Sequence, residues 1–250
     1  MALSSFKRVD FHVHSPVSAC YEDNMRPEAH LHTQPEDIVE AALAAGLDAI
    51  ALTDHNSARG IDAIREAAAR RGLVVFPGTE ITTRGGHLLA VFEQETPAAV
   101  ITGLVRALGF DEAKEGQGYE ESKVWLDEVA RLVTERGGLA IAAHIDRQPR
   151  GFTASYESIA DKKRIHASPH LAALEITVPS NKGAWTRGAM PHYTKRYPCV
   201  QDSDAHAPGE IGRRSTFLKL PALDLAALRL ALRDFEERVR FPEELDLAQG

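Results

Sequence analysis

Short apolar runs alternate with longer amphipathic stretches along most of the chain. The runs are rich in Val, Ile, Leu and Ala, which is typical of strands that are covered on both faces. They predict strands at 8–14, 47–53, 73–79, 139–145, 171–178 and 199–204.

The stretches between these runs carry helical spacing and stop signals. Thr33 to Glu36 has the pattern of a capping box with proline in the first turn, and Gly46 ends the helix that follows. Helices are also predicted at 61–71 and 120–136, each followed by glycine, and from Asp224 to Val239.

One unit departs from the alternation. The connection 83–86 is too short for a crossover helix, so 81–83 and 87–92 are predicted to form a hairpin. The glycine-rich stretch 109–118 and the segment 21–32 are predicted to be surface loops. Repeated strand–helix units indicate an α/β fold with a largely parallel sheet, either a barrel or a doubly wound sheet.

Composition narrows the class of protein further. The chain has 250 residues, and 29 Lys and Arg against 36 Asp and Glu leave a net charge of −7, which argues against non-specific binding of long nucleic acid. No linker divides it, so residues 1–250 are predicted to form one domain. No apolar run is long enough to span a membrane, and the first residues lack the apolar core of a signal peptide. With only Cys20 and Cys199, the expected location is the reducing cytoplasm.

Histidine and acidic residues fall at the ends of the predicted strands. His12 and His14 are two apart at the end of the first strand, so both side chains face the same way. The others at strand ends are Asp54, His55, Glu80, His144, Asp204 and His206. Because the carboxyl ends of parallel strands open on one side, these groups are expected to meet at one mouth.

A site built from imidazole and carboxylate groups, without a pair of thiolates, suits zinc, manganese or iron. The ligands are too many for a single ion, so two or three divalent ions are expected. A carboxylate such as Glu80 could bridge two of them.

The chain resembles a known family, the PHP superfamily, named for polymerase and histidinol phosphatase. The motifs that carry the resemblance are Asp10-Phe11-His12-Val13-His14-Ser15, Leu52-Thr53-Asp54-His55-Asn56, Gly78-Thr79-Glu80, His87-Leu88-Leu89, Ala143-His144 and Ser203-Asp204-Ala205-His206. The resemblance implies a distorted, TIM-like (β/α)7 barrel and phosphoester hydrolysis at a site with two or three metal ions. It implies ligands at His12, His14, His55, Glu80, His87, His144, Asp204 and His206.

One position departs from the family pattern. Cys20 stands where members with three ions carry a histidine, so it is either a thiolate ligand or a small buried residue. Asp23, His30 and His32 are the other candidates for that role.

The implied chemistry is attack on phosphorus by a hydroxide that bridges two metal ions. His12, His14 and Asp204 would hold one ion, His87 and His144 the other, and Glu80 would bridge them. His55 and His206 would bind a third ion or lie beside the leaving oxygen. The candidate proton donors to that oxygen are Asp54 and His206.

Substrate phosphate needs donors that fix its orientation, and arginine does this well through paired hydrogen bonds. The candidates are Arg147, Arg150, Lys182 and Arg187. Glu175 is a candidate partner for a ligand histidine. Tyr156 and Trp185 are candidates for stacking on a base or ring of the substrate.

The leading hypothesis is hydrolysis of a small phosphomonoester of the nucleotide, sugar phosphate or histidinol phosphate type. The alternatives are a phosphodiesterase or exonuclease acting on nucleic acid ends, and a metal-stabilised scaffold without catalysis. An amidohydrolase fits less well, because those barrels use a bridging lysine and end on a lone aspartate rather than Asp204-x-His206.

Overall fold

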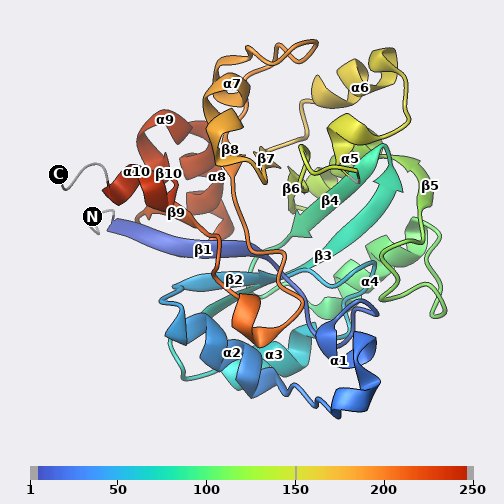
Figure 1. Cartoon of the computed structure of the whole chain (residues 1–250), viewed down its shortest axis with the longest axis vertical. Helices are drawn as coiled ribbons and strands as arrows, with labels where there is room; N and C mark the ends of the chain where they lie inside the picture. The colour runs from blue at the N-terminus through green and yellow to red at the C-terminus, as the bar shows by residue number, and fades with distance from the viewer. Residues whose placement is uncertain (1–4, 150, 247–250) are drawn as a thin grey trace.

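The computed structural model describes residues 5–149 and 151–246, and its central feature is one curved sheet (Figure 1). The strands follow the order β10-β9-β1-β2-β3-β4-β6-β7-β8, and β5 pairs with β3. Their bounds are β1 (Ser5–Val13), β2 (Ala49–Leu52), β3 (Val74–Arg84), β4 (Gly86–Val91), β5 (Ser122–Trp125), β6 (Leu139–Ala142), β7 (Ala173–Glu175), β8 (Cys199–Val200), β9 (Thr216–Leu220) and β10 (Val239–Arg240).

Seven of these strands form a nearly closed barrel. Neighbours are parallel from β1 to β3 and from β6 to β8, whereas β4 runs antiparallel to both β3 and β6. The barrel closes where the chain after β8 returns to β1: Val13 and Ala205 form a parallel bridge, and the His14 N–H donates to the Ala205 carbonyl at 3.0 Å. The predicted distorted, TIM-like barrel is confirmed, and the reversed β4 is its distortion.

Helices cover the outside of the barrel, with α2 and α3 packed together along one flank and α5 near α6 at another (Figure 1). None in the described part of the chain is long and apolar enough to cross a bilayer. The α-helices are α1 (Glu22–Met25), α2 (Pro35–Ala44), α3 (Ile61–Ala68), α4 (Ala98–Ala107), α5 (Leu126–Glu135), α6 (Ile159–His166), α7 (Lys182–Arg187), α8 (Leu225–Arg233), α9 (Phe235–Arg238) and α10 (Pro242–Asp246). Single 3-10 turns are η1 (Pro27–Ala29), η2 (Phe152–Ala154), η3 (Pro179–Asn181) and η4 (Pro208–Glu210).

The sheet buries apolar residues on both faces. Along β2, Ile50 and Leu52 belong to the core beneath α2 and α3, whereas Ala49 and Ala51 belong to a second core that α8 and β9 complete. Alternate residues of a strand point to opposite faces. Continuous apolar strands are therefore required here, as the sequence pattern indicated.

All four predicted helices differ from the observed ones, and α3, predicted to end at Arg71, ends at Ala68. The capping residue of α2 is Gln34, whose N–H donates to Asp37 at 2.7 Å, while the Thr33 hydroxyl donates to Asp23 instead. Residues 122–125 are not helical but form β5, because they pair with the long end of β3. The helix from Asp224 is capped as predicted but ends at Arg233, and Val239 pairs with β9.

The last barrel strand, β8, is shorter than the predicted strand 199–204, because side chains replace its backbone partners beyond Val200. The Phe11 N–H donates to the Asp202 carboxylate at 2.7 Å, and the Ser203 N–H donates to the Asp10 carboxylate at 3.0 Å. These two buried aspartates hold the chain beside β1. The residues that follow, including Asp204, therefore lie at the mouth of the barrel.

Candidate metal centre

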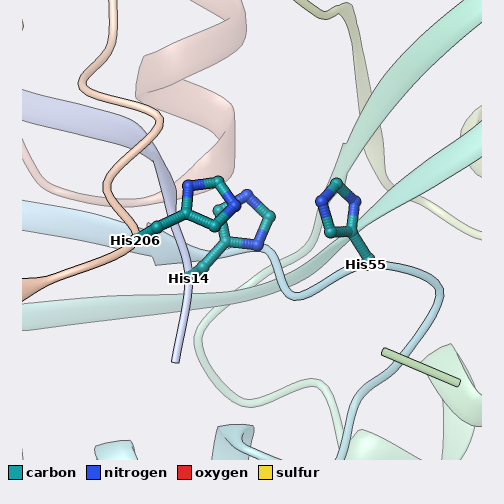
Figure 2. A group of neighbouring side chains, drawn as sticks. All are labelled: His14, His55 and His206. Atoms are coloured by element: carbon teal, nitrogen blue, oxygen red, sulfur yellow. The ribbon is translucent and has the colours of Figure 1, made fainter. Parts of the chain in front are cut away.

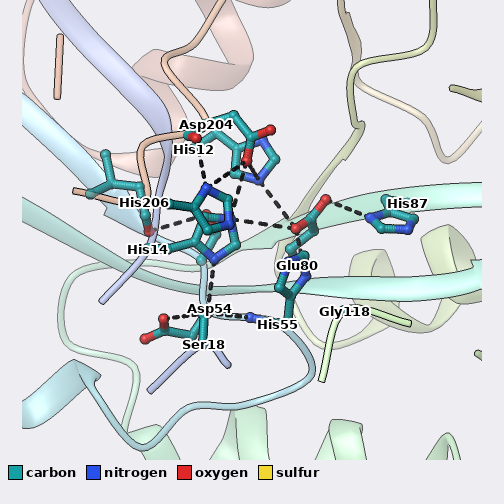
Figure 3. A network of polar contacts seen from close by, with 12 residues as sticks. His12, His14, Ser18, Asp54, His55, Glu80, His87, Gly118, Asp204 and His206 are labelled. Atoms are coloured by element: carbon teal, nitrogen blue, oxygen red, sulfur yellow. Dashed lines mark hydrogen bonds and ion pairs between the residues drawn. The ribbon is translucent and has the colours of Figure 1, made fainter. Parts of the chain in front are cut away.

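The ends of the barrel strands bring the predicted ligands together at one mouth. His12 lies in β1, His14 directly follows it, His55 follows β2, and Glu80 and His87 face each other on the β3–β4 hairpin (Figure 3). Groups of these side chains have ligand atoms within 4.8 Å of one another. The members of those groups are His12, His14, His55, Glu80, His87, Asp204 and His206.

Glu80 is at the centre of the cluster, and its two oxygens face different histidines. Oε2 is 2.8 Å from His55 Nδ1 and 3.3 Å from His12 Nε2. Oε1 is 2.7 Å from His87 Nδ1 and 2.9 Å from His144 Nε2. A carboxylate that divides its oxygens between two sets of ligands has the arrangement needed to bridge two ions.

A second carboxylate, Asp204, completes the side toward β1. Its Oδ1 is 3.2 Å from His12 Nε2 and 3.3 Å from His14 Nε2. The expected first set of His12, His14 and Asp204 is therefore assembled around one space.

A third group joins His14 to the remaining histidines (Figure 2). The ring centres of His14 and His206 are 4.1 Å apart, and those of His14 and His55 are 4.6 Å apart. The three rings converge closely enough to share an ion.

Unpartnered buried atoms show that this donor set suits metal ions. His12 Nε2, His14 Nε2, His55 Nδ1 and Glu80 Oε2 are buried, and among the described residues none of them has a partner with hydrogen-bond geometry, although Glu80 Oε2 lies close to two of the histidines. Leaving such atoms unpaired is costly in a protein interior. Divalent cations bound by nitrogen and oxygen would satisfy all four.

Buried acceptors behind the cluster orient the ligands. Glu175 lies 3.0 Å from His12 Nδ1 and also accepts the His144 N–H at 3.0 Å, which agrees with its predicted role. Ser18 lies 2.9 Å from His14 Nδ1 and donates its hydroxyl to Asp54 at 2.7 Å. Each contact leaves Nε2 of the histidine directed into the cluster.

Asp54 therefore lies behind His14 and not in the cavity. Its carboxylate accepts the Ser15 N–H and the hydroxyls of Ser15 and Ser18, and burial raises its pKa. This corrects the prediction that Asp54 could donate a proton to substrate. Of the two candidate donors, only His206 lines the cavity.

The cluster itself perturbs its ionisable groups. Burial opposes charge on Glu80, but His55, His12 and His87 hold the pKa of its carboxyl well below its usual range. Burial and the neighbouring His206 and His55 lower the pKa of His14 well below its usual value. Glu80 is thus a carboxylate and His14 a neutral imidazole, the protonation states that metal binding requires.

Two ligands hold a backbone conformation that favours glycine. The φ angles are +30° at His144 and +51° at Asp204. Such strain is tolerated where surrounding structure enforces it, and it is concentrated at functional sites.

Comparison with known proteins agrees with the geometry. A family model described as the PHP domain matches residues 10–177, more than half of the chain. The chain belongs to the PHP family. This membership agrees with the clusters of histidine and carboxylate side chains, which could hold metal ions.

One relative and two solved structures are similar to this chain. An uncharacterized protein of Methanocaldococcus jannaschii is 26% identical over 137 residues, which are 55% of this chain and 67% of that protein. The lesion-specific endonuclease of Pyrococcus furiosus has a TM-score of 0.68 and 17% identity, with 95% of this chain and 58% of that chain covered. A putative metal-dependent phosphoesterase of Bifidobacterium adolescentis has a TM-score of 0.53 and 19% identity, with 80% and 88% covered. This chain thus spans little more than half of the endonuclease.

Cys20, the position that departs from the family pattern, lies at the edge of the PHP cluster. It is partly buried and unpaired, and it lines the same cavity as His55 and His206. Burial opposes ionisation, but these two histidines lower the pKa of its thiol to about 6. The thiol therefore lies in the same cavity as two candidate ligands and is acidic, but it is not a member of the groups whose ligand atoms lie within 4.8 Å of one another. Asp23 is held by Thr33, and His30 and His32 are exposed.

The four predicted phosphate-binding residues separate into different places. Arg147 lines the cavity and forms an ion pair with Asp204. Lys182 and Arg187 line a separate hollow with Phe241, and Lys182 is paired with Glu244, because η3 and α7 turn away from the mouth. The prediction that they face the cluster is wrong. Arg150 lies outside the described residues.

The two aromatic candidates also lie elsewhere. Trp185 is fully buried beside His166 and Tyr193, and Tyr156 is fully exposed and does not line the cavity. The residues that do line its rim, Tyr119 and Met25, were not predicted. Tyr119 follows the glycine-rich stretch 109–118, and Met25 lies in the segment 21–32. Both stretches were predicted to be surface loops, but neither pattern indicated that the residues would reach the cavity.

Proposed function

We propose that this PHP protein hydrolyses a small phosphomonoester at the cluster around Glu80. The observation that supports this most directly is the division of the Glu80 oxygens between the His12 and His144 sides of the cluster. Divalent ions bound by these ligands, of which zinc, manganese and iron are the candidates, would activate water and neutralise phosphoryl charge.

A cavity of about 480 Å³ opens over the cluster. Its size is typical of sites for small molecules rather than of extended grooves. Together with the net charge of −7, it favours a compact phosphorylated substrate over a long polyanion.

Two side chains have distinct proposed roles in this cavity. Arg147 would orient the phosphoryl group, because its guanidinium is half-exposed and borders Asp204. His206 would protonate the leaving oxygen, or act as a ligand if a third ion binds. Its Nδ1 donates to the Asp204 carbonyl at 2.9 Å, which leaves Nε2 as the free ring nitrogen.

The test is phosphate release from nucleoside monophosphates, sugar phosphates and histidinol phosphate, with Mn²⁺ or Zn²⁺ and after chelation. We expect metal-dependent release that is lost in His12→Ala and Asp204→Ala and kept in His32→Ala, a matched exposed histidine. Absence of release from every ester, with metal bound, would contradict the proposal.

Arg147 has its own comparison. We expect Arg147→Ala to raise KM about tenfold or more, because a charge-assisted hydrogen bond contributes about 1.5–3 kcal/mol. Arg187→Ala, which removes an arginine from the separate hollow, serves as the control with unchanged KM. Equal effects of the two substitutions would exclude a direct role for Arg147.

Cleavage of nucleic acid is the second candidate. It is supported by the fold shared with the Pyrococcus endonuclease over 95% of this chain. Incubation with labelled single-stranded and duplex oligonucleotides distinguishes the two, since a diesterase shortens the strand whereas a monoesterase removes only terminal phosphate.

A further inference from the structure

A short loop, here called the 116–120 loop, crosses directly over one ligand of the cluster. The Gly116 N–H donates to the His55 carbonyl at 2.8 Å. Gly118 contacts the His55 ring so closely that a Cβ there would lie 2.6 Å from Nε2 (Figure 3). The loop is therefore part of the cavity wall.

Side chains from two neighbouring strand ends hold the loop in place. The Asn56 amide donates to the Gln117 carbonyl at 2.9 Å, and the Thr82 hydroxyl donates to the Gly118 carbonyl at 3.2 Å. Asn56 and Thr82 are themselves buried and joined, because the Thr82 N–H donates to the Asn56 side chain at 3.0 Å. The loop is anchored on the barrel at successive residues.

The anchored loop presents Tyr119 to solvent at the rim of the cavity. Its side chain is 78% exposed although it lines the same cavity as Glu80 and Arg147. Met25, at the end of α1, also lines this cavity and is 65% exposed. Beyond the polar cluster, the rim thus offers an aromatic ring and a polarizable thioether, both free to be covered.

We propose that Tyr119 and Met25 form a binding subsite for a planar ring on the alcohol part of the ester. The inference rests on the proposed function, because it takes the phosphate of the same molecule to lie at the metal cluster. The substrate class would then be phosphates of nucleosides or of other ring-bearing alcohols, and Tyr119 would determine specificity rather than take part in bond cleavage.

Kinetics with matched substrates test this assignment. Adenosine 5′-monophosphate carries a planar aromatic base that ribose 5-phosphate lacks. We expect Tyr119→Ala to raise KM for the first about tenfold, because base–aromatic stacking is lost, with kcat and the constants for ribose 5-phosphate unchanged. Tyr119→Phe, which keeps the ring, should behave as the unaltered protein, and Met25→Ala should show the same selectivity with a smaller effect.

A binding measurement separates this inference from the proposed function. Equilibrium dialysis of the phosphonate analogues of both phosphates, whose C–P bond is not hydrolysed, against the metal-loaded protein requires no turnover, and we expect tighter binding of the adenosine analogue that depends on Tyr119. If that preference is present but no ester is hydrolysed, the subsite stands and the proposed function fails. If phosphate is released but Tyr119→Ala affects both substrates equally or neither, or if neither analogue binds preferentially, the subsite is overturned.

Discussion

At the scale of single residues, the cluster depends on groups that contact ligands without facing the cavity. Glu175 faces His12 and the backbone of His144, and Ser18 connects His14 to Asp54. Each fixes which ring nitrogen is available to an ion. A substitution of such a group changes the orientation or the protonation of a ligand histidine, although every ligand residue is still present.

Glu175→Gln tests this role. The amide cannot accept from His12 Nδ1 and the His144 N–H with the strength of a carboxylate, so we expect metal affinity to fall about 10–100-fold. Titration with a competing chelator measures it. Glu128→Gln, an exposed residue of α5 paired with Arg131, is the control, and equal affinities in both variants would contradict the role.

Gly118→Ala tests the close contact between the 116–120 loop and His55. A Cβ 2.6 Å from the ring nitrogen forces the loop or His55 to move, so we expect reduced metal content and a reduced rate of phosphate release. Gly103→Ala is a matched control, because Gly103 lies within α4 with nothing near its Cβ position. Unchanged metal content in Gly118→Ala would show that the loop adapts without disturbing the ligand.

At the scale of elements, α6 packs against several aromatic side chains that lie away from the metal cluster. His166, in its last turn, lies 5.1 Å from the ring centres of both Tyr193 and Tyr197 and 5.7 Å from that of Trp185. Burial, with a smaller effect of Lys195, lowers the pKa of His166 from 6.5 to about 4. The folded protein therefore holds this imidazole neutral where the unfolded chain would protonate it.

Acid should accordingly weaken the packing of α6. Between pH 6.5 and 4 the unfolded chain binds a proton at His166 that the folded protein does not, so stability falls as pH falls through this range and is unaffected above it. We expect His166→Phe to show a shallower fall of Tm between these pH values. Both proteins are measured with chelator present, which removes the effect of metal release, and parallel Tm profiles would contradict the assignment.

At the scale of the whole molecule, the metal cluster joins segments that are distant in sequence. His12 belongs to the first strand and Asp204 follows the last strand of the barrel, and the two are 3.2 Å apart at their nearest atoms. Ions bound by these residues would hold the two edges of the barrel together. Because the ligands converge only in the folded arrangement, such binding would stabilise it.

Removal of metal should lower Tm. A ligand at a hundred times its Kd contributes about 2.7 kcal/mol, which corresponds to about 5–10 °C for a domain of this size. We expect chelation to cause such a fall and Mn²⁺ or Zn²⁺ to reverse it, as followed by thermal melting. The His12→Ala variant should not respond to chelator, and an unchanged Tm in the parent protein would show that the cluster does not bear on stability.

Pattern alone was sufficient for the α/β class and for most of the candidate ligands, because both depend on local order, whereas the choice of a barrel over a doubly wound sheet came from the family resemblance. Covered strands require continuous apolar runs, and ligands at the carboxyl ends of parallel strands meet at one mouth. His12, His14, Glu80 and Asp204 are therefore identifiable without coordinates. Where pairing is non-local, as for residues 122–125 on the end of β3, periodicity could not distinguish a strand from a helix.

The amino-acid order by itself indicated the α/β class and the chemical groups at the strand ends, because these follow from periodicity and from the positions of side chains within strands. The barrel, the family and the additional candidate ligand His87 followed from the motifs that carry the family resemblance. Only the tertiary structure decided what surrounds the candidate ligands. In that structure Asp54 lies behind His14, and Lys182 and Arg187 line another hollow. Tyr119 lies at the rim of the cavity. These outcomes depend on loop paths, which are fixed by hydrogen bonds between residues far apart in the chain, such as that from Asn56 to Gln117.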